Sequence, residues 1–513
     1  MKKIFLVCMI GVALVSCNKE LNQQPISSAT TPNFYQQPSD FIQGVNAVYN
    51  SLRAIPDQLM YLSETRSDNI YPTNTDAARD HDPISDFSSG IAANTYVEGA
   101  WSNDFSGIFK ANTILDELSK NADKVGSVAL AGRLTAEARF LRAYFYFDLV
   151  RYYGKLPIIN QPVTSAEANK IPRSAVADVD TLIMADLKYA IENLPVDYSG
   201  TFPSYTASDV GRATKYAAEA LLAQVYMARS GPTYNIDGPG LASNEWNLAL
   251  PLLQDIISSG KYQFATDFKS IFSYSNQSPV VNKEAVFDVM YITGQNPVLG
   301  ATFTWDLVPN SYFSSLPSGN SLANGSLGAP SVSYNLLDSY SSGDIRTSPT
   351  IHTTGYTFSG TYYPYPFFRK YLDTTKIPTT SRFDWGINFI AIRYTDILLL
   401  KAECILHGAS GTQSDVDDIV NQVRVRAGLT TLTNVTLDQL YNERRWEFAG
   451  EGLRWFDLQR SGNLITIMNS FETSDDAVRK VMSPVVNNSV IYPVPQSQLD
   501  ASPGLYTQNL GYN

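Results

Sequence analysis

The sequence predicts a mainly α-helical protein in which TPR-like helical hairpins form an α-α superhelix and carry a large, irregular, loop-rich insertion with short strands. Apolar residues recur at i+3 and i+4 steps over most of the chain, which is typical of helices that bury one face. Successive helical segments of similar length follow one another without a strict repeat, as in degenerate helical hairpins. Between residues 294 and 389 this periodicity stops, and Gly, Ser, Asn, Pro and Tyr dominate.

The first two predicted helices frame a polar stretch. Residues 41–52 and residues 111–118 carry apolar side chains at helical spacing. Residues 63–94 between them are rich in Asp, Asn, Ser and Thr, with Tyr71 and Pro72 in the turn-prone centre. We therefore expect residues 63–94 to form an exposed loop.

The strongest helical signal runs from about residue 134 to residue 153 and ends at Gly154. Large apolar residues such as Phe140 also lie outside its main stripe, so this helix is expected to be buried nearly all round. Asp148 and Arg151 are three residues apart on it, and we expect them to pair, because a lone buried charge is costly.

The middle of the chain predicts a helix pair and a third helix. The pair comprises residues 175–193 and residues 211–229, and the second member is rich in alanine, which lets helices approach closely. The third helix spans residues 246–258 and closes at Gly260. A strand is predicted over residues 285–291.

The C-terminal part predicts further helices after the irregular segment. So long a segment of low regularity is uncommon in a compact domain unless it has a function, so residues 294–389 are the leading binding-loop candidate. Helical spacing then returns in residues 390–407, 415–427 and 437–458, and the tail from residue 491 is Pro-rich and extended.

The N-terminus has the pattern of a lipoprotein signal. Met1 and two lysines precede an apolar run, Ile4 to Val15, that is too short to span a bilayer. The run ends in Leu14-Val15-Ser16-Cys17, which has the form of a lipobox, so cleavage before Cys17 would leave a lipidated N-terminal cysteine held by several acyl chains. An ordinary signal peptide with a chance cysteine is the alternative, but an A-x-A-like site is missing.

These patterns predict a simple domain organisation. Residues 1–16 form the signal peptide, residues 17–35 the lipidated tether, and residues 36–513 one domain. Within that domain the helical scaffold comprises residues 36–293 and 390–513, separated by the irregular segment.

Cysteine content and charge restrict the possible partners. Cys8 leaves with the signal and Cys17 carries lipid, so Cys404 remains the one thiol and no disulfide can form within the mature chain. The formal net charge is −11, which makes nucleic acid a poor partner.

No catalytic motif is present. The sequence contains no G-x-S-x-G elbow, no P-loop and no G-x-G-x-x-G after a strand. Its three histidines, His81, His352 and His407, lack the spacing of a zinc site. We therefore predict a non-enzymatic binding protein without metal or cofactor, although no pattern in the sequence would reveal a structural calcium ion. A pair of carboxylates for glycoside hydrolysis stays open among 49 acidic residues.

The charged residues near the C-terminus have a structural interpretation. Glu443, Arg444, Glu447, Glu451 and Arg454 have helical spacing, which favours ion pairing along one element over catalysis.

Five motifs, spread over nearly the whole mature chain, resemble the SusD/RagB family. They are Ala138–Gly154 with the following Leu156-Pro157, Gly211–Ala223, Arg393–Leu399, Glu443–Leu458 and Tyr492–Tyr512. The resemblance implies a scaffold of four TPR-like hairpins in an outer-membrane lipoprotein that captures glycans without cutting them. It also implies a lid-like role over a SusC-like TonB-dependent transporter. The residues after Cys17, Asn18-Lys19-Glu20, are a weak version of the family's acidic export run, so exposure on the cell exterior is inferred from the resemblance.

Sugars present C–H faces that flat aromatic rings can cover, and hydroxyl rims that Asn, Asp or Arg can bond. Trp101 occupies a place where the family commonly carries a structural tryptophan, so core packing is its alternative role. The candidate ligand-binding residues are Trp305, Tyr312, Phe313, Asp68, Asn69, Tyr71 and Trp101.

Two other functions stay open at this point. One is a surface-anchored helical glycoside hydrolase or lyase, and the other is peptide capture, as by a RagB-like binder. The identity of the ligand is not encoded in any pattern of the sequence.

Overall fold

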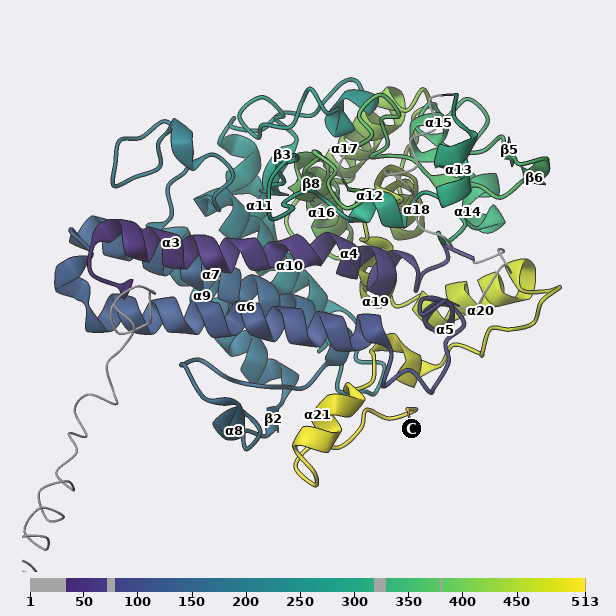
Figure 1. Cartoon of the computed structure of the whole chain (residues 1–513). Helices are drawn as coiled ribbons and strands as arrows, with labels where there is room; N and C mark the ends of the chain where they lie inside the picture. Colours follow the sequence, from purple (N-terminus) through teal and green to yellow (C-terminus); the bar gives the residue numbers. More distant parts are fainter. Residues whose placement is uncertain (1–33, 72–78, 318–328, 379–380, 513) are drawn as a thin grey trace, which may run out of the picture.

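The computed structural model is mainly helical, as predicted (Figure 1). The long helices α6 (Thr95–Lys120) and α7 (Val128–Tyr153) pack along each other, and α3 (Pro38–Tyr49) packs against both. The structure describes residues 34–71, 79–317, 329–378 and 381–512. Cys17, the signal peptide and most of the predicted tether lie outside these residues.

The remaining scaffold helices pack on one another in chain order. Helix α7 contacts α9, α9 contacts α10, α10 contacts α11, α11 contacts α16, and α16 contacts α17. This succession of neighbouring helices confirms the predicted helical class. Their bounds are α9 Val176–Asn193, α10 Lys215–Ser230, α11 Trp246–Ser258, α16 Tyr394–Leu406, α17 Gln413–Arg426, α18 Leu437–Phe448, α19 Arg454–Ser461 and α20 Leu464–Asp475.

Helix α7 is the buried centre of the scaffold. The Ser127 side chain caps its first turn, and Gly154 ends it with a φ of 70°, a backbone conformation that favours glycine. Between residues 140 and 153 every side chain except that of Arg151 is buried. Arg151 pairs with the buried Asp148 at 2.7 Å, which confirms the predicted ion pair.

The N-terminal helix is longer than predicted. A 3-10 turn (Asn50–Ala54), α4 (Ile55–Leu59) and a π-helical turn (Met60–Glu64) follow α3 directly and extend the helical rod to residue 64. The expected exposed loop is wrong for residues 63–71, all of which are buried. The Glu64, Asp68 and Asn69 side chains bond residues between positions 445 and 454, and composition alone does not reveal those partners.

Residues 390–407 do not form one helix. The segment begins as strand β8 (Phe389–Arg393), which pairs antiparallel with β3 (Ala285–Val289), and α16 starts only at Tyr394. An apolar run of this length fits a buried strand as well as a helix, and the pairing with β3 decides between them.

The predicted helix over residues 437–458 is also broken. Gly450 and Gly452 have φ values of 78° and 74°, which separate α18 from α19. Their N–H groups donate to the Glu64 carboxylate, each at 2.9 Å. The break therefore satisfies a buried carboxylate that lies almost 400 positions earlier in the sequence.

Strands β3 and β8 bracket the irregular insertion, which lies on one side of the long helices (Figure 1). It has its own core, including Phe303, Phe367 and Trp385, all almost fully buried. The predicted short strands are present, but four short helices were not predicted. The elements are α12 Phe303–Asp306, α13 Asn310–Ser315, α14 Tyr334–Ser339, α15 Thr347–Thr350, and the antiparallel pairs β4 (Ile351–His352) with β7 (Phe367–Phe368) and β5 (Tyr356–Phe358) with β6 (Thr361–Tyr363).

The described chain also contains small peripheral α-helices and a strand pair. They are α5 (Asp82–Ser85), α8 (Ser165–Ala168), α21 (Gln496–Ala501), and β1 (Leu156–Pro157) paired with β2 (Arg173–Ser174). None of the helices in the described ranges combines the length and the apolar character needed to cross a bilayer.

Candidate functional site

Trp305 lies on the short helix α12 and forms a partly exposed aromatic face with two residues from a later loop. Its ring centroid is 5.1 Å from that of Phe383, with the planes at 69°. The Arg382 guanidinium carbon lies 5.0 Å from the Trp305 ring centre and 4.9 Å from that of Phe383. Phe383 is 37% exposed. We call Trp305, Arg382 and Phe383 the aromatic face.

The two loops that carry the aromatic face are tied together. The backbones of Ala301 and Trp385 exchange hydrogen bonds of 2.8 and 3.2 Å, and the Trp385 indole N–H donates to the Arg382 carbonyl at 3.0 Å. The Asp384 carboxylate accepts from the Gly294 N–H at 2.8 Å. The face is therefore held in place before any ligand arrives, so little conformational entropy would be lost on binding.

Asp306, which follows Trp305 on α12, forms a pair of carboxyl groups with Asp57 of α4. Thr302 donates to Asp57 Oδ2 at 2.5 Å, whereas Asp57 Oδ1 meets no donor in the described part of the chain. Burial raises the pKa of Asp57 to about 6, although Thr302, Asp306 and Arg53 each lower it. Burial, reinforced by repulsion from Asp57, raises the pKa of Asp306 well above its usual range. This arrangement favours a proton shared between Asp57 and Asp306.

Aromatic residues of the scaffold adjoin this carboxyl pair. Tyr96, in the first turn of α6, stacks on Tyr61 with the ring centroids 3.8 Å apart, and Tyr61 stacks on His81 at 6.1 Å. The Tyr61 hydroxyl also donates to Asp306 and so opposes the rise of its pKa. Tyr96 is half-buried. The carboxyl pair therefore connects the helix that carries Trp305 to the helical scaffold.

Replacing Asp306 by Asn is expected to reduce the loss of stability that occurs as pH rises above about 4. A carboxyl whose pKa is raised in the folded state binds more protons there than in the unfolded state, so the free energy of unfolding falls as pH rises above the ordinary pKa of an aspartate, about 4. Asn mimics the protonated acid and should remove about 1–2 kcal/mol of this loss.

Urea unfolding at pH 5 and pH 7.5 measures the effect. The control is Asp116→Asn, which removes an exposed carboxylate on α6 and should leave the pH dependence unchanged. Equal pH dependence in wild type and Asp306→Asn would contradict the shared proton.

Asp68 and Asn69, two of the predicted ligand contacts, are buried and already engaged. Arg454 binds the Asp68 carboxylate with two hydrogen bonds of 2.8 Å, and Arg445 donates to Asn69 Oδ1 at 2.8 Å. Burial would raise the pKa of Asp68, but Arg445 and Arg454 outweigh it and lower that pKa to about 2. These side chains fasten the early segment to α18 and α19, and they offer no free surface to a ligand.

Apart from Trp305, the other residues predicted to contact a ligand lie in the core. Tyr71 donates to Asp476 at 2.5 Å beneath the surface. Trp101 takes the alternative core role and lies 5.1 Å from the Tyr153 ring. Tyr312 and Phe313 of α13 are also buried, and they support neighbouring aromatic rings of the insertion. Solvent-exposed turns and buried aromatic anchors have similar local composition, so the sequence did not separate them.

The charged residues of α18 pair across elements and not along one. We call the following set the central ion network: Arg346, Lys370, Arg393, Arg424, Arg426, Glu284, Asp344, Glu443, Glu447 and Glu451. Glu447 lies at its centre, 2.8 Å from Arg393, 3.2 Å from Arg346 and in contact with Arg426. Because Arg346 and Lys370 belong to the insertion, this network fastens the insertion to the scaffold.

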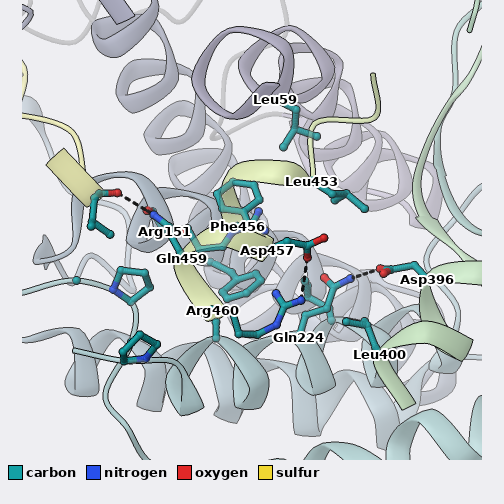
Figure 2. A pocket seen from close by; sticks show the side chains of 18 of the residues that line it. Leu59, Arg151, Gln224, Asp396, Leu400, Leu453, Phe456, Asp457, Gln459 and Arg460 are labelled. Carbon is teal, nitrogen blue, oxygen red and sulfur yellow. Dashed lines mark hydrogen bonds and ion pairs between the residues drawn. The ribbon is translucent and has the colours of Figure 1, made fainter. Parts of the chain in front are cut away.

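An enclosed pocket between α10, α16 and α19 is lined by another part of the charged interior (Figure 2). Gln224 donates to Asp396 at 3.2 Å, and Arg460 donates to Asp457 at 2.8 Å. The cavity volume of about 60 Å³ suits a few water molecules and is far below the roughly 300–1,000 Å³ of ligand pockets. We therefore do not assign the ligand to this pocket. Within the described ranges, no group of three or more His, Cys, Asp or Glu side chains is arranged to hold a metal ion.

Two family profiles match the chain. The profile of the SusD family matches residues 320–512, and a profile described as starch-binding associating with outer membrane matches residues 21–227. The chain belongs to the SusD/RagB family. This confirms the resemblance that the five sequence motifs indicated.

Relatives with SusD-like names agree with this assignment. A SusD-like protein of Bacteroides ovatus is 28% identical over 380 residues, which covers 71% of this chain and 65% of the relative, just under two thirds of its length. SusD-like protein P2 of Formosa agariphila is 26% identical over 552 residues, covering 100% of this chain and 99% of the relative.

Solved structures show the same SusD-like fold. Surface glycan-binding protein A from Bacteroides fluxus is 24% identical, with a TM-score of 0.76 over 92% of this chain and 99% of that one. A laminarin-binding SusD-like protein is 25% identical, with a TM-score of 0.73 over 93% and 100%. Surface glycan-binding protein A from Bacteroides thetaiotaomicron, solved with laminarihexaose, is 22% identical, with a TM-score of 0.75 over 93% and 100%.

The aromatic face combines a residue that the sequence indicated with others that it did not. Trp305 was selected because it is an aromatic residue in the irregular segment. Arg382 and Phe383 follow almost 80 positions later. Tyr61 and Tyr96, which adjoin the neighbouring carboxyl pair, come from scaffold helices. No local pattern marks these four residues, because their relation to Trp305 arises only from the pairing of distant loops.

Proposed function

We propose that this chain captures neutral oligosaccharides at the cell surface, without cleaving them, and delivers them to a SusC-like TonB-dependent transporter in the outer membrane. The observation that carries the proposal is the pre-ordered aromatic face of Trp305, Arg382 and Phe383 on the insertion. The shared fold with a laminarin-binding SusD-like protein supports a glucan as its ligand.

The chemistry of the face suits a sugar. A partly exposed indole and a phenyl ring nearly perpendicular to it can cover the C–H faces of pyranose rings. Arg382, whose guanidinium lies over both rings, adds N–H donors that could bond the hydroxyl groups of a sugar beside it. Capture of this kind needs no cofactor.

Anchoring to the outer membrane completes the proposal. Cys17 would carry the lipid, and residues 17–35 would form the tether to the scaffold. The matching profile described as starch-binding associating with outer membrane supports this location, and exposure on the exterior follows from capture of external glycans.

Hydrolysis is the competing function, and the carboxyl pair beside Trp305 is the group to consider for it. Glycosidases place their two carboxyl groups roughly 5–10 Å apart, so that a sugar or a water molecule fits between them. Asp57 and Asp306 instead interact directly with each other and with Thr302. The pair therefore favours a structural role.

The binding test uses the purified protein lacking its lipid anchor in native gels that contain laminarin, soluble starch or polygalacturonate. We expect laminarin or starch to retard the protein and polygalacturonate to leave its mobility unchanged. The same mixtures are assayed for new reducing ends, and none are expected. Release of reducing ends, or binding only to a peptide mixture, would overturn the proposal in favour of hydrolysis or of peptide capture.

Replacing Trp305 by Ala is expected to weaken glucan binding by at least about 1 kcal/mol, because one stacking ring is lost. The free energy of unfolding should also fall, by about 2–4 kcal/mol, since most of the ring is buried against the core. Calorimetric titration with laminarihexaose or maltohexaose measures affinity, and urea unfolding measures stability.

Phe109→Ala is the matched control. Phe109 is 51% exposed on α6, 13 residues and therefore about 20 Å along the helix from Tyr96. The Phe109→Ala protein should bind glucan as the wild type does. If Trp305→Ala lost stability but kept its affinity, Trp305 would belong to the core and not to the site.

A further inference from the structure

A second aromatic surface stands apart from the aromatic face, on the hairpin of β5 and β6. The hairpin projects beyond α13 and α14 at the edge of the molecule (Figure 1). Its register pairs Tyr356 with Tyr363, and Thr357 with Tyr362. Because side chains alternate along a strand, these two pairs lie on opposite faces of the hairpin. We call it the tyrosine hairpin, residues 356–363.

One face of the tyrosine hairpin anchors it to the insertion. The Tyr356 and Tyr363 rings stack with centroids 5.2 Å apart and planes at 8°. The Tyr356 hydroxyl is 2.6 Å from Ser311 Oγ, and the buried Tyr312 ring lies 5.4 Å from the Tyr356 ring. Tyr312, which the sequence predicted as a ligand contact, thus supports the hairpin from α13.

The opposite face presents one ring in a fixed position. Tyr362 is 60% exposed, yet its hydroxyl donates to the Thr354 carbonyl at 3.2 Å. Gly355, with a φ of 63°, lets the ring tip come close, because a Cβ atom there would lie 2.6 Å from the Tyr362 hydroxyl. A ring held at both ends keeps its exposed face oriented without further loss of entropy.

The sequence segment that carries Tyr362 contains no formally charged residue. Residues 347–368 contain no Asp, Glu, Lys or Arg, although 17% of the whole chain is charged. Thr357, the cross-strand partner of Tyr362, places an exposed hydroxyl group beside the ring. A single flat ring with a small hydroxyl group beside it matches a neutral sugar unit. An anionic glycan would require basic side chains, and a protein partner would require a broader apolar area.

We propose that Tyr362 and Thr357 contact a second segment of a long neutral polysaccharide, separate from the segment held by the aromatic face. This inference rests on the proposed glucan capture. Two contacts on one rigid insertion raise the affinity for a polymer, because the second contact becomes intramolecular once the first has formed. A short oligosaccharide gains nothing from the second contact.

The test compares Tyr362→Ala, Tyr362→Phe, Trp305→Ala and the control Phe109→Ala with the wild type. Each protein is titrated with laminarin and soluble starch, and with their hexasaccharides, laminarihexaose and maltohexaose. We expect Tyr362→Ala to weaken polymer binding about fivefold and to leave hexasaccharide binding unchanged. Tyr362→Phe keeps the ring and should bind polymer as the wild type does, whereas Trp305→Ala weakens both.

The possible results separate the two proposals. A wild-type protein that binds no glucan refutes the proposed function itself. A wild type that binds, together with unchanged polymer affinity in Tyr362→Ala, refutes the second contact alone. Equal losses for polymer and hexasaccharide would make Tyr362 part of the first site. Loss of co-purification with the transporter at unchanged polymer affinity would assign the hairpin to a protein interface instead.

Discussion

Replacing Glu447 by Gln is expected to lower the free energy of unfolding by about 3–5 kcal/mol, the cost of breaking a buried ion pair by removing one partner. Glu447 is fully buried and contacts three arginines, Arg346, Arg393 and Arg426. Gln has nearly the same shape, so the loss isolates the charge. Its amide would also turn an N–H₂ group toward a guanidinium.

The same contacts predict the pH dependence of this contribution. Burial would raise the pKa of Glu447, but Arg426, Arg393 and Arg346 outweigh it and hold that pKa far below its usual range. The stabilisation is therefore complete above the ordinary pKa of a glutamate, about 4.3, and is lost as pH falls below that value. The difference between wild type and Glu447→Gln should shrink in acid.

Urea unfolding at pH 7 and pH 3 measures both effects. Asp116→Asn is the matched control, because it makes the same carboxylate-to-amide change in an exposed pair with Lys120. That control should cost at most about 0.5 kcal/mol. A loss below 1 kcal/mol in Glu447→Gln would show that the central ion network does not hold the insertion on the scaffold.

Replacing Cys17 by Ser is expected to move the protein from the outer membrane to the soluble fraction. A serine hydroxyl does not accept the diacylglyceryl group, so none of the acyl chains would be attached. Each buried CH₂ contributes about 0.8 kcal/mol to anchoring, and the several chains of a lipoprotein together bind stably where one chain binds only marginally. We therefore expect almost all of the Cys17→Ser protein to leave the membrane fraction.

Membrane fractionation and labelling with a fatty-acid probe detect this change. Cys8→Ser is the control, because Cys8 lies in the segment that cleavage removes. It should be labelled and retained like the wild type. A Cys17→Ser protein that still carried the probe would disprove lipidation at this position.

The sequence predicted those elements whose signal is local. Helix α7 has an apolar stripe, a serine cap and a terminal glycine within one stretch, and its predicted end at Gly154 is confirmed. The predictions for residues 390–407 and 437–458 were wrong at points where a distant partner decides. Strand β3 draws Phe389–Arg393 into a strand, and Glu64 stabilises the break between α18 and α19.

The candidate site was likewise predictable only where the signal is local. Trp305 could be selected because an aromatic residue in an irregular segment is unusual in itself. Asp68 and Asn69 were placed in a polar loop, but Arg454 and Arg445 from the far end of the chain bury them. Phe383 joined the face only because the Ala301–Trp385 pairing brings its loop to α12. Contacts between residues so far apart in the sequence produce no periodic pattern in a single sequence.

A crystal structure of the protein with laminarihexaose or maltohexaose bound tests the central claim most directly. The account predicts a sugar ring stacked on Trp305, with Phe383 beside it, Arg382 bonded to a hydroxyl group and the glycosidic bonds intact. The account would be contradicted by a sugar bound elsewhere, for example in the polar hollow beside Arg139 and Asn160, while the face of Trp305 stays empty.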